Sequence, residues 1–250
     1  TAILYVFPVY FSFYKWFKKY AFFAVIMTGT SLSFWPYGIN GMRNGLATSF
    51  FIFALAFKDK KWLMYGIIGI SISFHTSMIL PAAALLITEL YKNTKLLLKL
   101  WLTSIPISFL FGRKLMGIVN FLVTSSIGQL DGRGDFSGVD NNAFASSSFR
   151  IDFIIYSATV IYIGYYFIFK KQFKDPFFLK VFNIYIIANT VWLYFIYFPF
   201  TNRIAYLSWF LIPILIVYPI VYVNNLKNQS YFMASCIAVS LFFVWGLAYL

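Results

Sequence analysis

The residues best suited to chemistry begin at a short break in an apolar stretch, where residues 35–43 read WPYGINGMR. A proline and two glycines interrupt a helix there, and a new helix starts near Asn40 and Arg43. The first backbone N–H groups of a helix lack partners within it, and the helix dipole favours negative charge at that end. Arginine adds a planar fork of donors that binds phosphate or carboxylate through two hydrogen bonds. Asn40 and Arg43 therefore predict a site for an anion.

His75 is the only histidine of the chain and follows a short apolar run, in the sequence Phe74-His75-Thr76-Ser77. An ionisable side chain within such a run is costly to bury and is by default a functional candidate. Its imidazole can donate to an anionic leaving group or accept a proton from a hydroxyl group. The sequence leaves both roles open, and Asp152 is an equally good candidate for the base. With a single histidine, no P-loop and no dinucleotide-binding glycine motif, we expect no metal and no cofactor.

Two more arginines stand at the starts of later apolar runs. Arg150 and Asp152 follow the polar segment of residues 128–148, and Asn202 and Arg203 precede the run that begins at Ile204. We predict that Arg150 and Asp152 orient a substrate at the mouth of a cavity. The predicted catalytic residues are His75, Arg43, Arg203 and Asp152, and the predicted substrate-binding residues are Asn40, Arg150, Arg113, Ser77 and Asn202.

The composition decides what kind of protein must position these residues. Hydrophobic residues make up 61% of the 250 positions and charged residues only 11%, whereas a soluble domain carries about 25% charged residues. There is too little polar surface for a water-soluble globule. Inside a bilayer only helices and closed barrels satisfy the backbone, and the long apolar runs lack the alternation of barrel strands. We therefore predict an all-α, polytopic integral membrane protein, with a single transmembrane domain over residues 1–250.

The distribution of basic residues predicts the orientation of these helices. Fourteen lysines fall in or beside five short turns between apolar runs, and lysine-rich turns mark the cytoplasmic side of a membrane. The opposite side then holds all five arginines and one lysine, Lys114. Topology does not explain arginines on that side, whereas an anionic ligand would. The net charge of +13 therefore reflects membrane orientation, and we expect no nucleic-acid partner.

The lengths of two short runs place the chemistry below the outer surface. Fourteen residues separate Arg43 from Lys58, and His75 follows Lys61 by fourteen positions. As helices of ~1.5 Å per residue, each run spans ~21 Å, less than the ~30 Å hydrocarbon core. We expect Arg43 and His75 at similar depth, on the floor of an outward-facing cavity. The surrounding bundle is predicted to hold about nine spanning or part-spanning helices.

The stretch from Leu100 to Ile127 must cross the membrane once but is too long for one straight span. We expect it to include a separate interfacial helix at Lys114–Ile127. That helix would lead into an external loop at residues 128–150, the one extended polar segment of the sequence, which is long enough to act as a substrate lid.

Several of these residues together resemble a known family. The pattern is Asn40-x-x-Arg43-x-Gly45-x-Ala47, then an apolar run, a lysine turn, a second short run that ends in Phe74-His75-x-Ser77, and later Arg203-x-x-Tyr206. It resembles the Wzy-type bacterial polysaccharide repeat-unit polymerases, in particular their EpsG-like branch. That family often has glutamine after the first arginine, where this chain has Asn44. Its members have a longer N-terminus, so the resemblance implies a fragment that lacks the native N-terminal helices.

The resemblance implies a GT-C-like fold and an inverting membrane glycosyltransferase. Such an enzyme transfers a growing glycan from undecaprenyl diphosphate to the next lipid-linked repeat unit, on the outer face of the bacterial inner membrane, in O-antigen, capsule or exopolysaccharide synthesis. Its partners would be the undecaprenyl-diphosphate-linked glycan and membrane lipid, with a chain-length regulator as a further candidate. In this scheme Arg43 and Arg203 bind the departing diphosphate, and His75 either donates to it or acts as the base.

Two other functions compete with this one. A flippase for lipid-linked oligosaccharides also needs outward cationic residues, but such transporters usually contain repeated halves, and the sequence has no convincing internal repeat. A membrane O-acyltransferase would use His75 but would not need five outer arginines. The products separate the three functions, because a flippase leaves single repeat units, a polymerase lengthens them, and an acyltransferase moves label from acyl-CoA.

Overall fold

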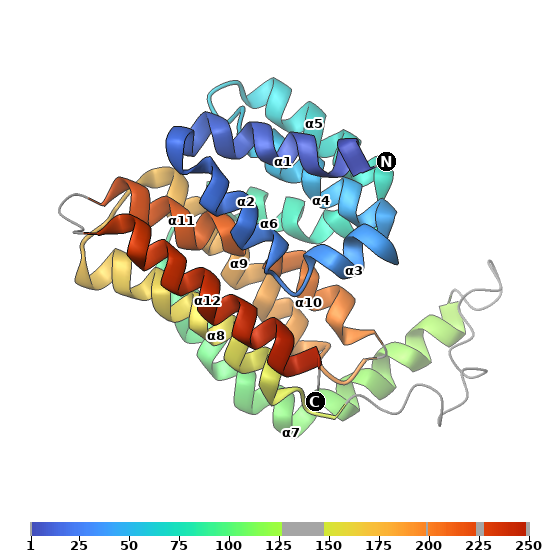
Figure 1. The fold of residues 1–250 in the computed structure, drawn as a ribbon. Helices are drawn as coiled ribbons and strands as arrows, with labels where there is room; N and C mark the ends of the chain where they lie inside the picture. The colour runs from blue at the N-terminus through green and yellow to red at the C-terminus, as the bar shows by residue number, and fades with distance from the viewer. Residues whose placement is uncertain (1, 127–147, 199, 224–227, 249–250) are drawn as a thin grey trace.

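Every regular element in the described residues is a helix, and the helices stack against one another as a bundle (Figure 1). The structure is a computed structural model that describes residues 2–126, 148–198, 200–223 and 228–248. These helices confirm the all-α prediction for the described part of the chain. In chain order the elements are α1 (Ala2–Phe17), η1 (Lys18–Tyr20), α2 (Ala21–Gly29), α3 (Phe34–Ile39), α4 (Met42–Leu55), α5 (Lys61–Phe74), η2 (Thr76–Met78), α6 (Ile79–Leu90), α7 (Thr94–Ser126), α8 (Ile151–Tyr165), the π-helical turn η3 (Tyr166–Lys170), α9 (Pro176–Tyr194), α10 (Thr201–Trp209), α11 (Ile212–Tyr222) and α12 (Gln229–Ala248).

Within the described residues, four helical stretches are long and apolar enough to cross a membrane, and α10 and α11 together form one of them. Three shorter apolar helices accompany them. The chain is therefore a multi-pass membrane protein, although these lengths do not confirm the expected total of about nine spanning or part-spanning helices. The four long stretches are Thr94–Ile118, Ile151–Lys170, Pro176–Tyr194 and Thr201–Tyr222, and the three shorter ones are Lys61–Phe74, Thr76–Leu90 and Gln229–Phe242.

Helix α7 differs from the prediction. It runs without a break from Thr94 to Ser126, so the expected separate helix at Lys114–Ile127 is wrong. Pro106 lies inside α7 and removes one backbone hydrogen bond, but a continuous helix still satisfies almost all the other backbone groups. The last turns of α7 extend away from the other helices, at the lower right of Figure 1. The length of this stretch therefore did not require a break.

Helix α9 lies at the centre of the core. Its side chains are apolar on nearly every side, and Tyr185 and Trp192 are fully buried. A helix that is apolar all round has to be surrounded by other helices, and α9 packs against α6, α7 and α10. Its start is fixed by Asp175, whose carboxylate accepts the backbone N–H of Phe178 at 2.8 Å. Helix α10, which carries Arg203, is therefore held against a well-packed centre.

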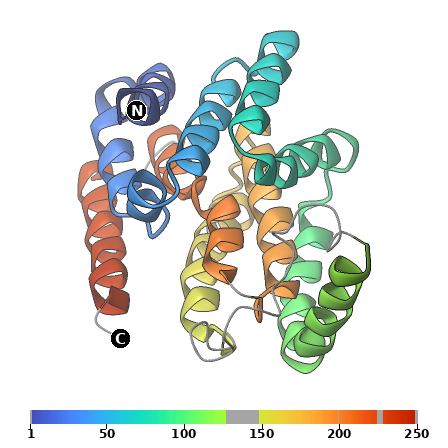
Figure 2. The same cartoon turned by 90° about the vertical axis from the view of Figure 1, so that its right-hand side faces the viewer.

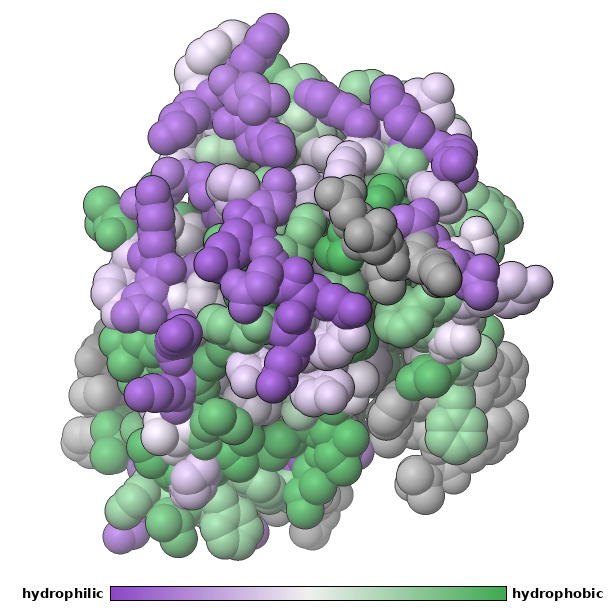
Figure 3. All heavy atoms as spheres, turned by 90° about the vertical axis from the view of Figure 1, so that its left-hand side faces the viewer, coloured by the Kyte–Doolittle hydropathy of each residue, from purple (hydrophilic) through white to green (hydrophobic). Residues whose placement is uncertain are grey.

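The lysine-bearing turns lie together at one end of the bundle. Figure 3 looks at the side of the molecule that is on the left in Figure 1, and hydrophilic side chains gather over its upper and middle parts. The turns within the described residues are joined by contacts across the helices, so they share one face, as expected from their lysines, and Lys227 of the fifth turn lies outside those residues. These contacts are Lys15 with the backbone carbonyl of Ala56, Lys58 with the ring of Phe177, Lys61 and Lys180 with Glu89, and Lys95 with the ring of Phe169.

Candidate functional site

Three segments that are far apart in the sequence line one open cavity of about 500 Å³. The break between α3 and α4 supplies one wall, the turn between α5 and η2 supplies His75, and the start of α10 supplies Arg203. Figure 2 views the end of the bundle where the starts of α4 and α10 lie near each other. The structure thus brings together residues that the sequence singled out one by one. The lining residues are Ile39, Asn40, Gly41, Met42, Arg43, Asn44, His75 and Arg203.

A smaller hollow of about 120 Å³ adjoins this cavity and shares four of its lining residues. It adds Tyr37 of α3 together with Asn202 and Tyr206 of α10. The ring centroid of Tyr37 lies 5.2 Å from that of Tyr206 in an edge-to-face contact. The Tyr37 hydroxyl donates to the backbone carbonyl of Arg203 at 3.4 Å. These contacts hold α3 and α10 together where both helices contribute to the site.

A close approach between α3 and α4 positions Arg43. The backbone N–H of Gly41 donates to the carbonyl of Pro36 at 2.9 Å, which closes α3. Helix α4 begins at once, with Arg43 as its second residue. Two residues later, a Cβ atom on Gly45 would lie 2.8 Å from the backbone carbonyl oxygen of Tyr37, which cannot move aside cheaply. Gly45 therefore sets how near the two helices come.

The guanidinium groups of both arginines in the cavity lack a carboxylate partner in the described part of the chain. Arg43 and Arg203 are exposed, and neither forms a salt bridge with a carboxylate of the described residues. Arg203 lies 4.6 Å over the ring of Phe200, which orients its fork without using its N–H donors. Among the residues that the structure describes, no acidic side chain lines the cavity. Two guanidinium groups in a cavity of this kind favour an anionic ligand with several oxygen atoms.

His75 is held at the junction of α5 and η2 through its Nδ1 atom. The backbone N–H of Ser77 donates to Nδ1 at 3.2 Å, and the Ser77 hydroxyl oxygen lies 2.7 Å from the same atom. That hydroxyl also lies 3.2 Å from Oδ1 of Asn44 on α4. Nε2 has no hydrogen-bond partner among the described residues. Partial burial, together with the positive charges of Arg43 and Arg203, holds the pKa of His75 below its ordinary value of 6.5, so the imidazole is uncharged at neutral pH.

Three of the predicted residues lie away from the cavity lining. Arg150 precedes α8 and grips Asp152 through two nitrogens, with Nε 2.9 Å from Oδ1 and Nη2 2.5 Å from Oδ2. The same guanidinium lies 3.6 Å over the ring of Phe153. Arg113, on α7, lies 5.4 Å over the ring of Tyr197. The carboxylate of Asp152 is therefore paired with Arg150, and neither residue is among those that line the cavity.

The other predicted residues do meet at the site. Asn40, Arg43, His75 and Arg203 line the larger cavity, Asn202 lines the smaller hollow, and Ser77 contacts His75. Of the external loop predicted at residues 128–150, residues 128–147 lie outside the described part of the chain, and Arg133 lies among them.

The site also contains residues that the sequence analysis did not select. Asn44 was noted only as a departure from the family pattern, yet it contacts Ser77 across two helices. Tyr206 was noted only as part of the family pattern, and its spacing of three residues from Arg203 places it on the same side of α10. The role of Tyr37 depends on how α3 packs against α10, and no local pattern carries that information.

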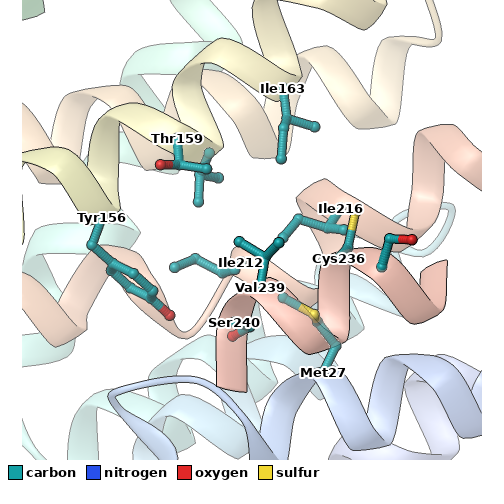
Figure 4. A pocket seen from close by; sticks show the side chains of 11 residues that line it. Met27, Tyr156, Thr159, Ile163, Ile212, Ile216, Cys236, Val239 and Ser240 are labelled. Atoms are coloured by element: carbon teal, nitrogen blue, oxygen red, sulfur yellow. The ribbon is translucent and has the colours of Figure 1, made fainter. Parts of the chain in front are cut away.

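A separate groove of about 190 Å³ lies between α8 on one side and α11 and α12 on the other (Figure 4). Thr159 and Ile163 of α8 lie across it from Ile216 of α11 and Val239 of α12. Its lining is mostly apolar and includes no charged side chain. The groove suits an alkyl chain, whereas the arginine-lined cavity suits an anion.

One comparison with known proteins identifies a family for this chain. The sequence matches the EpsG family over residues 1–249, a range that includes every residue of the cavity. Searches of curated proteins and of solved structures returned no match. The family match spans far more than half of the chain and supports a role of the membrane polysaccharide polymerase type. The chain therefore belongs to the EpsG family.

Proposed function

We propose that this chain lengthens a glycan carried on undecaprenyl diphosphate, at the outer face of the bacterial inner membrane. The observation that supports the proposal most is the cavity that Arg43, His75 and Arg203 line together, with both guanidinium groups unpaired in the described residues. A diphosphate presents several oxygens to such forked donors. Membership of the EpsG family supports the broader role in polysaccharide polymerisation at a membrane.

The proposed reaction joins two lipid-linked glycans. A hydroxyl oxygen of the acceptor unit attacks the anomeric carbon of the donor glycan from the side opposite the diphosphate. The bond between that carbon and the diphosphate oxygen breaks, and its electron pair leaves with the diphosphate. The hydroxyl proton of the acceptor ends on the released undecaprenyl diphosphate, so no further reactant is needed. Attack from the opposite side inverts the anomeric configuration.

Each residue of the cavity has a place in this scheme. Arg43 and Arg203 bind the diphosphate and stabilise the negative charge that develops on it as the bond breaks. His75 contacts the diphosphate as well. Asn40 and Asn202, at the edges of the two hollows, offer amide groups to sugar hydroxyls.

The remaining features fit around this centre. Arg150 and Asp152 neutralise each other, and we assign them to shaping the mouth of the site rather than to a chemical step. The apolar groove between α8 and α12 is our candidate for the polyprenyl chain of a substrate. The lysine-bearing face points to the cytoplasm in this proposal, and the arginine-lined cavity points to the periplasm or the exterior.

The test supplies purified protein in nanodiscs with undecaprenyl-diphosphate-linked repeat units and separates the products by length. A ladder of longer glycans supports the proposal. Single units that only change leaflet would instead identify a flippase, and label transferred from acyl-CoA would identify an O-acyltransferase. Either of these results without a ladder overturns the proposal.

A further inference from the structure

A chain of hydrogen-bonding groups runs from Asn44 through Ser77 to His75, and its direction decides what His75 does. In one direction Nδ1–H donates to the Ser77 hydroxyl, which donates to Oδ1 of Asn44, and Nε2 faces the cavity as an acceptor. In the other direction the Ser77 hydroxyl donates to Nδ1, and Nε2 carries the proton. The distances of 2.7 Å and 3.2 Å between the heavy atoms fit both directions.

The backbone N–H of Ser77 distinguishes the two directions. It lies 3.2 Å from Nδ1 of His75 and can only donate, so Nδ1 must offer a lone pair. The arrangement is fixed by the backbone, because His75 caps η2 in an extended conformation with φ −157° and ψ 123°. Nδ1 therefore accepts, and the single proton of the neutral ring lies on Nε2. Asn44 completes the chain by turning its amide, whose two ends have nearly the same shape, so that Nδ2 donates to the Ser77 oxygen.

The charges around the ring favour the same direction. Arg43 on α4 and Arg203 on α10 are the charged residues that line the cavity with His75. Both attract an anion into that space. A lone pair on Nε2 would face the anion and repel it, whereas an N–H group would attract it. With the proton on Nε2, all three side chains present donors to the same ligand.

We propose that neutral His75 carries its proton on Nε2 and serves as a hydrogen-bond donor to the anion held by Arg43 and Arg203, with Ser77 and Asn44 as the positioning residues that fix this tautomer. The tautomer follows from the contacts with Ser77, whereas the identity of the anion rests on the proposed function. In the glycosyl transfer, Nε2–H then stabilises the departing diphosphate, and His75 does not take the proton of the acceptor hydroxyl.

The chain contains one histidine, which makes the tautomer directly measurable. Protein labelled with ¹⁵N-histidine in nanodiscs gives one pair of ring nitrogen signals, and their shifts and N–H couplings show which nitrogen carries the proton. Above the pKa of His75, we expect a protonated Nε2 and an unprotonated Nδ1. A protonated Nδ1 in the wild-type protein overturns the proposal.

Two substitutions test the positioning residues. Ser77→Ala removes the hydroxyl but keeps the backbone N–H, so we expect Nε2 to keep the proton. Asn44→Asp introduces a carboxylate that only accepts, so the Ser77 hydroxyl turns to it and protonated Nδ1 becomes populated. An unchanged tautomer in Asn44→Asp contradicts the assignment of Asn44. Ser73→Ala is the matched control, because the exposed Ser73 hydroxyl donates to the carbonyl of Ile70 in its own helix.

Activity provides a second, independent readout. Both the neutral ring and the imidazolium donate from Nε2, so the rate of polymerisation should not fall as the pH decreases through the pKa of His75. A general base would lose activity there. His75→Gln keeps an N–H group near the position of Nε2 and should retain about tenfold more activity than His75→Ala. A loss of rate that follows the NMR titration of His75, or equal loss in the two variants, overturns the donor role.

The two readouts separate this proposal from the proposed function. If the protein makes no ladder but His75 is protonated on Nε2, the proposed function fails and the tautomer stands. If the protein makes a ladder but Nδ1 carries the proton, the proposed function stands and the donor role fails.

Discussion

Asn189 and Asn44 belong to two polar networks built from asparagine amides and serine hydroxyls, and the two networks differ in whether every donor has an acceptor. Asn189 is fully buried in α9. Its Oδ1 accepts the indole N–H of Trp101 at 2.8 Å, and its Nδ2 donates to the hydroxyls of Ser157 and Ser208 at 3.0 and 2.9 Å. These bonds join α7, α8, α9 and α10, and each N–H of the asparagine amide has an acceptor. The network is closed.

The network of Asn44 is open. It passes through Ser77 to His75 and stops at Nε2, which has no partner among the described residues. The guanidinium groups of Arg43 and Arg203 lie in the same cavity without a carboxylate from the described part of the chain. The first network fixes the packing of helices, whereas the second leaves donors that a ligand can use. Substitutions in the two networks should therefore affect different properties.

The largest expected effect is a loss of polymerisation rate when the arginines beside the open network are replaced. Arg43→Lys and Arg203→Lys keep the charge but lose the planar fork, and each should reduce the rate of polymerisation by about a hundredfold. Both side chains are exposed, so the thermal unfolding midpoint in detergent should hardly change. Product ladders and thermal unfolding, measured on the same preparations, check the two expectations. Full activity in Arg43→Lys would show that two-point recognition at this position is wrong.

The next largest expected effect is a loss of protein stability when the closed network is broken. Asn189→Leu leaves the indole N–H of Trp101 without an acceptor and removes the donor to Ser157 and Ser208, at a cost of about 3 kcal/mol. Asn44→Leu is the matched substitution at a half-buried position and should cost less than about 1 kcal/mol, while it lowers activity because Asn44 lines both hollows. Unfolding midpoints of the two variants test this contrast. Similar midpoints would contradict the division between the networks.

The sequence predicted the components of the open network better than those of the closed one. Arginines on the side poor in lysine, a break with proline and glycine, and a lone histidine are each unusual in an apolar chain, so Arg43, His75 and Arg203 could be found one by one. The equal lengths of two short runs placed Arg43 and His75 in one predicted cavity, and both residues do line the same cavity. Asn189 carries no such signal, because one asparagine in a long apolar helix looks the same whether or not its partners are present.

Some features depend on packing that no local pattern encodes. Arg150 pairs with Asp152, and neither residue is among those that line the cavity, a placement that depends on how α8 packs. The continuous α7 shows that a long apolar stretch with an internal proline stays helical when its backbone has no better partner. The contact between Asn44 and Ser77 joins residues 33 positions apart, and only the packing of α4 against α5 and η2 brings them together.

A smaller effect is expected where a glycine positions the open network. Gly45→Ala places a methyl group against the carbonyl of Tyr37 and should move α4, reducing activity about tenfold and stability by about 1–3 kcal/mol. Gly66→Ala on α5 is the control, because nothing lies within 4 Å of the added atom. Removing a flexible glycine from a helix should stabilise that variant by about 0.5–1 kcal/mol. Activity and unfolding midpoints that are alike in the two variants would exclude a positioning role for Gly45.

The smallest effect is expected for an arginine that belongs to neither network. Arg113 on α7 lies 5.4 Å over the ring of Tyr197 and is absent from the lining of the cavity. Lysine can occupy that position over the ring, so Arg113→Lys should change the rate of polymerisation by less than about twofold. This result would show that the guanidinium groups of the cavity matter and that an arginine outside the cavity lining does not. A loss as large as that of Arg43→Lys would instead mean that substrate binding extends along α7, and the boundary of the site would have to be drawn to include it.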